Sequence, residues 1–178
     1  MEPFRYLKTG EDRNLSFAKK LWEFAKEQKY NPANDFDPER DKLIVVFDGD
    51  IFEEKVQGYD ELITSIEESD LAAVTNPNFE LFLVLHKVGS YERYIKGHED
   101  DFLLRDEKNR YSHAYNILLE LTGVNAKTNS KIGELAEDVL IAIEQEKKIN
   151  QDIHRLRGNV TSNIGKIVES IIEENPGL

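Results

Sequence analysis

Hydrophobic residues recur at helical spacing near the start of the chain and then form a short continuous run. One face of a helix over residues 14–29 would carry the apolar side chains Leu15, Ala18, Leu21, Trp22 and Ala25. Asp12 or Asn14 is available to cap this helix. Two prolines then mark residues 30–41 as a loop. The β-branched run KLIVVF, residues 42–47, predicts a strand that is covered on both faces of a parallel sheet.

The same alternation continues in the next part of the chain. Residues 52–68 predict a second helix, whose apolar face carries Tyr59, Leu62, Ile63 and Ile66. DLAAVT, residues 70–75, then predicts a second strand. Helix, strand, helix and strand in succession indicate an α/β fold.

A third helix is predicted directly after the second strand. Asn76 is suited to its N-cap, and Pro77 to its first position, where a missing N–H costs nothing. The helix over residues 76–87 would be apolar nearly all round and therefore buried, with Gly89 as its end.

The C-terminal part, residues 111–178, has a mainly helical pattern. The polar stretch before it, residues 90–110, gives no assignment. Helices are predicted over residues 112–123, which Ser112 and Gly123 bracket as caps, and over residues 130–148 and 161–174. We therefore expect an α/β fold with a parallel sheet flanked by helices and a mainly helical C-terminal third.

Composition limits the class of protein. A chain of 178 residues with 39% hydrophobic residues suits one domain spanning residues 1–178. No apolar run approaches the roughly 20 residues that cross a bilayer, and the first residues lack the features of a signal peptide. We therefore expect a cytoplasmic protein with no membrane partner. Because the chain has 0 cysteines, a metal would need oxygen or imidazole ligands, which favours Mg²⁺, Mn²⁺ or Ca²⁺.

The charge balance argues against broad, salt-driven binding to nucleic acid. There are 23 basic residues against 35 acidic ones, for a net charge of -12. This balance leaves room for a nuclease that holds its substrate at a few points or that depends on a partner for affinity.

The candidate chemistry begins where the first predicted strand ends. Asp48 and Asp50 lie two residues apart, so their side chains would face the same way from an extended chain, with only Gly49 between them. Open α/β sheets bind ligands at the carboxyl ends of their strands, and Mg²⁺ takes one or two carboxylates. The pair indicates either a metal site or a capped acidic turn.

Three families use such an acidic pair. IVVFDGDIF resembles the opening motif of haloacid-dehalogenase-like phosphatases, but Phe52 stands where that family has Thr or Val. A nucleotide-sugar transferase would need a nucleotide-binding half upstream, and fewer than fifty residues precede Asp48. The third family has the Toprim domain, in which the acidic pair ends a parallel strand and binds a divalent metal.

A second motif favours the Toprim class. VTNPNFELFLVLH resembles the signature of the RloB-like family, also known from the abortive-infection protein AbiLii, in the matching positions Thr75, Asn76, Pro77, Phe79, Glu80 and His86. KTGEDRNLSFAKKLWEFA and GNVTSNIGKIVESI are similar to the opening and closing segments of the family. The resemblance implies a Toprim-type, metal-dependent nuclease of bacterial phage defence. Its substrate would be DNA or tRNA, and its partner an SMC/ABC-like ATPase.

The resemblance also implies roles for individual residues. Asp48 and Asp50 would hold Mg²⁺ or Mn²⁺ as catalytic ligands, and Glu80 would help to hold the metal or orient its ligands. Asn76 would fix the loop. His86 is a candidate binding residue, with a hydrogen-bonded core histidine as the alternative.

One departure from the family pattern concerns the start of the chain. Family members begin with a strand ending in a glutamate-bearing motif, whereas this sequence starts MEPFRYLKTG, in which Glu2 and Pro3 look like the tail of that motif. We therefore expect either a truncated start or the loss of the catalytic glutamate. The second case predicts a non-catalytic, degenerate Toprim subunit that binds or regulates the ATPase. A phosphatase is the third hypothesis, and the oligomeric state, homo-oligomers included, is left open.

Overall fold

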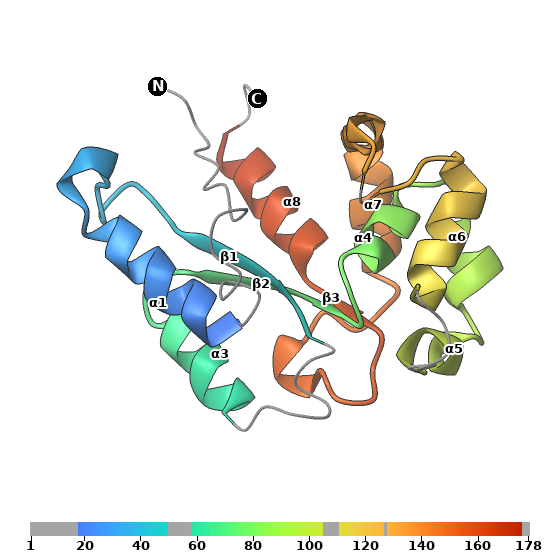
Figure 1. Ribbon diagram of the computed structural model, residues 1–178, viewed down its shortest axis with the longest axis horizontal. Coiled ribbons are helices and arrows are strands. Elements are labelled where there is room, and N and C mark those ends of the chain that lie inside the picture. Colours follow the sequence, from blue (N-terminus) through green and yellow to red (C-terminus); the bar gives the residue numbers. More distant parts are fainter. Residues whose placement is uncertain (1–17, 50–57, 105–110, 127, 176–178) are drawn as a thin grey trace. The chain divides into compact units, whose positions relative to one another are not determined.

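The structure is a computed structural model, which describes residues 18–49, 58–104, 111–126 and 128–175 of the 178-residue chain (Figure 1). The first half contains α1 (Ala18–Lys29), the 3-10 helix η2 (Pro32–Asn34), β1 (Ile44–Asp48), α3 (Tyr59–Glu67), β2 (Leu71–Asn76) and α4 (Glu80–Leu85). The second half contains the π-helix η3 (Tyr91–Ile95), α5 (Glu99–Leu103), α6 (His113–Thr122), the 3-10 helix η4 (Ser130–Asp138), α7 (Val139–Glu146), the 3-10 helix η5 (Ile153–Arg155), β3 (Thr161–Ser162) and α8 (Ile164–Glu174).

The described strands form one sheet in the order β1-β2-β3. Leu71 donates its N–H to the carbonyl of Leu43, and Gly49 donates to the carbonyl of Thr75. The later residue of one segment, Gly49, bonds to the later residue of the other, Thr75, so β1 and β2 run parallel. The predicted α/β class and the two predicted strands are confirmed. The expectation that the first strand is covered on both faces is wrong, because Val46 in β1 is 47% exposed.

The third strand makes the sheet mixed. β3 pairs antiparallel with β2, with Thr75 opposite Ser162 and Asn76 opposite Thr161. The helix predicted over residues 161–174 therefore begins only at Ile164, as α8. A strand of two residues has no periodicity, which is why the sequence pattern did not reveal it.

The chain divides into two compact units. The first consists of residues 1–45 and 61–72, and the second of residues 46–60 and 73–178. In the first unit, α1 buries Trp22, whose Nε1 donates to Ser65 Oγ at 3.3 Å. Near the end of α1, Lys29 Nζ lies 2.7 Å from a carboxylate oxygen of buried Asp70. Burial alone would raise the pKa of Asp70, but the hydrogen bonds from Lys29, Ser69 and Leu43 hold it below its ordinary value.

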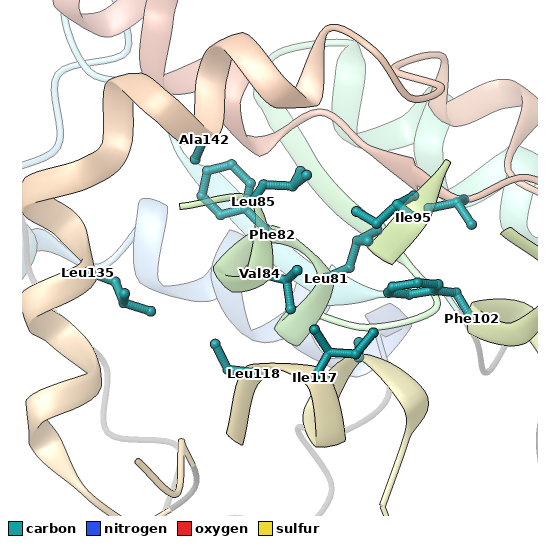
Figure 2. Packing of buried hydrophobic residues seen from close by; sticks show 12 residues of the cluster. Leu81, Phe82, Val84, Leu85, Ile95, Phe102, Ile117, Leu118, Leu135 and Ala142 are labelled. Atoms are coloured by element: carbon teal, nitrogen blue, oxygen red, sulfur yellow. The ribbon is translucent and has the colours of Figure 1, made fainter. Parts of the chain in front are cut away.

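The second unit is built around the short helix α4. Four α4 side chains are buried, Leu81, Phe82, Val84 and Leu85, and they pack with residues of α6, η4 and α7 (Figure 2). Figure 2 shows Ile117 and Leu118 on α6 facing this helix. The prediction of a helix that is apolar nearly all round, and hence buried, is confirmed in this segment.

Several predicted boundaries differ from the structure. The helix predicted over residues 130–148 is divided into η4 and α7. In the unassigned stretch 90–110, the described residues form η3 and α5. The caps proposed at Asp12 and Asn14, and the helix start proposed at residue 52, lie outside the described residues. The caps predicted for α6 are confirmed, since Ser112 Oγ accepts from Tyr115 N at 3.1 Å and Gly123 has a φ of 65°.

Among the helices in the described ranges, none combines the length and the apolar character of a bilayer-spanning segment.

Candidate functional site

Asp48 is the last residue of β1, and its carboxylate contacts the segment that follows β2. Asp48 Oδ1 accepts hydrogen bonds from the backbone N–H of Phe79 at 2.8 Å and from the Thr75 hydroxyl at 3.3 Å. The Asp48 residue is half-buried, whereas Thr75 is buried. This carboxylate therefore ties the end of β1 to the end of β2 and to the residues before α4. Asp50, its predicted companion, lies outside the described residues.

Gly49 permits a close approach of the chain at this strand end. A Cβ at position 49 would lie 2.9 Å from both methyl groups of Leu156 and 3.1 Å from the carbonyl oxygen of Thr75. Gly49 N also donates to that carbonyl at 2.6 Å. The absence of a side chain between the two aspartates therefore serves packing against Leu156 as well as the spacing of the acidic pair.

Asn76 is a strand residue, and its prediction as a helix N-cap is wrong. It pairs with Thr161 in the sheet, and α4 begins only at Glu80. The pairing with β3 holds residue 76 in extended backbone. Its fully buried amide Nδ2 donates to the carbonyls of Leu156 at 3.1 Å and Asn159 at 3.0 Å. Pro77 does not open the helix as predicted, because α4 begins three residues later, at Glu80.

Glu80 begins α4, one residue after the contact between Asp48 and Phe79. It is partly exposed and is the acidic residue in the first turn of the helix. The structure thus brings the start of α4 to the carboxyl end of β1, through the backbone of Phe79. Glu80 therefore follows the residue that bonds to Asp48, and its role toward a metal stays a prediction.

The donor chemistry of this site suits a hard cation. Carboxylate oxygens are the ligands that Mg²⁺ prefers, and it typically takes one or two of them together with water and phosphate oxygens. The described part of the chain contains no group of three or more His, Cys, Asp or Glu residues that could hold a metal. Of the residues predicted to hold Mg²⁺ or Mn²⁺, Asp48 and Glu80 are described and offer carboxylate oxygens, whereas Asp50 lies outside the described residues.

His86 lies at the opposite end of α4, in the core. It is 4% exposed, and its Nδ1 donates to the carbonyl of Phe82 at 3.0 Å. The rings of Phe82 and His86 also meet edge to face, with their centroids 4.9 Å apart. Burial lowers the pKa of His86, which favours the neutral ring. Since a helix rises about 1.5 Å per residue, Glu80 and His86 are roughly 9 Å apart along the axis. These contacts are those of a hydrogen-bonded core histidine, the alternative to a binding role for His86.

A buried carboxylate that the sequence reasoning missed lies between α7 and α8. Glu146 is 0% exposed. It accepts hydrogen bonds from Ser162 Oγ at 2.5 Å, Gly165 N at 2.8 Å, Lys166 N at 2.9 Å and Gln151 Nε2 at 2.9 Å. Burial raises the pKa of Glu146, against the opposing effect of these hydrogen bonds. It lies within the helix predicted over residues 130–148, and no motif in the sequence distinguishes it from the other acidic residues there.

Two more side-chain amides organise this unit, and sequence reasoning did not identify either of them. Gln145 Nε2 donates to the carbonyls of Leu85 at 2.6 Å and Lys87 at 2.7 Å, which satisfies backbone acceptors at the end of α4. Asn163 Oδ1 accepts from Val74 N at 2.8 Å, which attaches the residue before α8 to strand β2. Asparagine and glutamine carry no periodic signal, so only their surroundings identify them.

Comparison with known proteins gives one result. The family model described as "RloB-like protein" matches residues 4–171 of the chain. The searches of curated proteins and of solved structures each returned no match.

Proposed function

Because the chain belongs to the RloB-like protein family, we propose that it is a metal-dependent phosphodiesterase, a cytoplasmic nuclease that hydrolyses DNA or tRNA. The observation that carries this proposal is the position of Asp48. It ends a parallel strand at the edge where α/β sheets bind ligands, and the start of α4 is bonded to its carboxylate.

The residues divide the work as follows. Asp48 and Asp50 would hold Mg²⁺ or Mn²⁺, and Glu80 would orient the ligands. When bound, the metal would polarise the phosphate and stabilise negative charge on the attacking and leaving oxygens. The Phe79 N–H fixes one oxygen of Asp48, so the carboxylate keeps one orientation. Asn76 holds the neighbouring loop through the Leu156 and Asn159 carbonyls.

The biological setting belongs to the same proposal. By its resemblance to this family, the proposed nuclease would act in bacterial phage defence by abortive infection, together with an SMC/ABC-like ATPase. The net charge of -12 supports dependence on a partner, because such a chain has little general attraction for nucleic acid.

The test is a cleavage assay on DNA and on tRNA with added Mg²⁺ or Mn²⁺. We expect Asp48→Ala to lower the rate by about 100-fold or more, since a metal ligand supplies several kcal/mol of transition-state stabilisation. Asp37→Ala is the matched control, because Asp37 Oδ1 also accepts a backbone N–H, from Glu39 at 3.0 Å, but lies outside the site. Equal rates for wild type and Asp48→Ala would remove the assignment.

A second candidate function is a non-catalytic subunit that binds or regulates the ATPase. One observation favours it: Asp48 Oδ1 already accepts two hydrogen bonds within the protein, as a purely structural carboxylate would. Calorimetric titration with Mg²⁺ and Mn²⁺ separates the two. Tight binding to the ATPase without metal affinity would establish the non-catalytic role. Phosphate release from an aryl phosphate would instead indicate the phosphatase.

A further inference from the structure

Residues 153–159, which we call the arginine loop, lie against the strand end that carries Asp48. Tyr59 donates its hydroxyl to the carbonyl of Ile153 at 2.9 Å. Asn76 Nδ2 donates to the carbonyls of Leu156 and Asn159. The Leu156 methyl groups lie so close to Gly49 that a Cβ there would be 2.9 Å away. The loop is therefore attached to the ends of both parallel strands.

Side-chain amides hold the backbone of the arginine loop in one conformation. Asn159 Nδ2 donates to the carbonyl oxygens of Arg155 at 2.9 Å and Arg157 at 3.1 Å. Asn150 Nδ2 also donates to the Arg155 carbonyl, at 3.1 Å. These bonds satisfy backbone acceptors that would otherwise bind water, so they fix the direction in which the loop displays its side chains.

The loop buries Ile153 and Leu156 and exposes its other residues. Leu156 is 1% exposed and anchors the loop, whereas Arg155 and Arg157 on either side of it are exposed. The Arg155 side chain is 82% exposed, and its Nε lies 3.5 Å from Asp152 Oδ2. An exposed pair of this kind is worth about 0–1 kcal/mol, so phosphate can replace Asp152. Arg157 forms no ion pair with any residue that the structure describes.

We propose that Arg155 and Arg157 bind the phosphodiester backbone of the nucleic-acid substrate and position it at the carboxyl end of β1. This inference rests on the proposed nuclease function. A chain of net charge -12, with Asp48 at the site, repels a phosphate, so the substrate needs local positive charge to approach. Guanidinium groups suit this role because they stay charged and can bind phosphate through two parallel hydrogen bonds.

The test measures binding without catalysis. A short fluorescein-labelled DNA duplex and a labelled tRNA are titrated with the full chain in EDTA, and fluorescence anisotropy gives Kd at several salt concentrations. We expect Arg155→Ala and Arg157→Ala each to raise Kd about 3- to 10-fold and to lower the salt slope by roughly 0.9 on the duplex. Arg157→Lys should recover part of the loss, since it keeps the charge but not the paired hydrogen bonds.

Arg40→Ala is the matched control. Arg40 has an 85% exposed side chain whose Nε lies 3.5 Å from Asp37 Oδ2, three residues earlier, in the same arrangement as Arg155 and Asp152. It precedes β1 in the chain and should leave Kd unchanged. If Arg40→Ala weakens binding as much as Arg155→Ala, or if wild type binds neither probe, the proposal is overturned.

Cleavage with Mg²⁺ separates this inference from the function on which it rests. The expected result for the double variant, Arg155→Ala with Arg157→Ala, is a raised KM with kcat little changed, which a general loss of structure would not produce. Cleavage that depends on Asp48 but shows the wild-type KM in the double variant would overturn the arginine role alone. Arginine-dependent binding without metal-dependent cleavage would overturn the nuclease function alone.

Discussion

The carboxylates of Asp48, at the end of β1, and Glu146, at the end of α7, both accept backbone N–H hydrogen bonds, but they differ in burial. Glu146 is fully buried and accepts four hydrogen bonds shared between its two oxygens. Asp48 is half-buried, and the Phe79 N–H and the Thr75 hydroxyl both bond to its Oδ1.

This difference separates a structural carboxylate from a candidate ligand. Glu146 is fully buried, and its carboxylate joins the end of α7 to the first turn of α8 through the N–H groups of Gly165 and Lys166. Asp48 is only half-buried at the end of β1, where the Phe79 N–H and the Thr75 hydroxyl orient its Oδ1. Burial and hydrogen bonding together therefore distinguish the two roles, whereas charge alone does not.

The largest effect is expected from removing the buried carboxylate. Glu146→Ala leaves the N–H groups of Gly165 and Lys166 without their acceptor, which should lower the free energy of unfolding by about 2–4 kcal/mol. Urea denaturation of wild type and Glu146→Ala measures this change in the free energy of unfolding. Glu144→Ala is the control, because Glu144 is an exposed neighbour on α7 that pairs with Lys147 and should cost less than about 1 kcal/mol. Equal losses would mean that Glu146 is no structural anchor.

The next effect tests how closely Glu146 approaches α8. A Cβ at position 165 would lie 2.8 Å from Glu146 Oε2 and 3.2 Å from Ile143 Cα, so Gly165→Ala should cost about 1–3 kcal/mol. A Cβ at Gly133 meets nothing within 4 Å, and Gly133→Ala should be neutral or stabilise by up to roughly 1 kcal/mol. Thermal unfolding of Gly165→Ala and Gly133→Ala measures both changes in stability. A Gly165→Ala protein as stable as wild type would show that the carboxylate can move.

A smaller loss of stability is expected at the candidate ligand. Asp48→Ala removes the hydrogen bonds from Phe79 and Thr75 at a half-buried position and should lower the free energy of unfolding by about 1 kcal/mol. The same urea titration gives the value. A loss as large as that of Glu146→Ala would place Asp48 among the structural carboxylates and favour the non-catalytic subunit.

The smallest effect is a dependence of stability on pH. The pKa of Glu146 is raised in the folded protein above its ordinary value of 4.5. As pH rises from 4.5 through the folded pKa, the unfolded chain loses this proton before the folded protein does, so the Glu146 contribution should lower stability. Because hydrogen bonds offset part of the burial effect, the change is modest. Urea midpoints over this range, for wild type against Glu146→Gln, measure it, and parallel curves for the two proteins would contradict it.

The sequence predicted the regular elements better than it predicted the site. Apolar runs and caps located β1, β2 and α6, because hydrophobic periodicity and capping are local properties. Asp48 was predicted as a metal ligand because it follows such a run directly, and its role stays a prediction. Asn76 was misread, since an Asn-Pro pair starts helices in many proteins and only pairing with Thr161 keeps this one in a strand.

Local sequence by itself determined the α/β order, the buried character of α4 and the candidate carboxylate at the end of β1. Tertiary structure alone decided that Glu146 is an internal anchor, that β3 exists, and that Leu156 brings two arginines to the strand end. The physical reason is distance along the chain. Asn76 meets Leu156, and Val74 meets Asn163, only after some eighty or more intervening residues have folded, and no local pattern encodes such a contact.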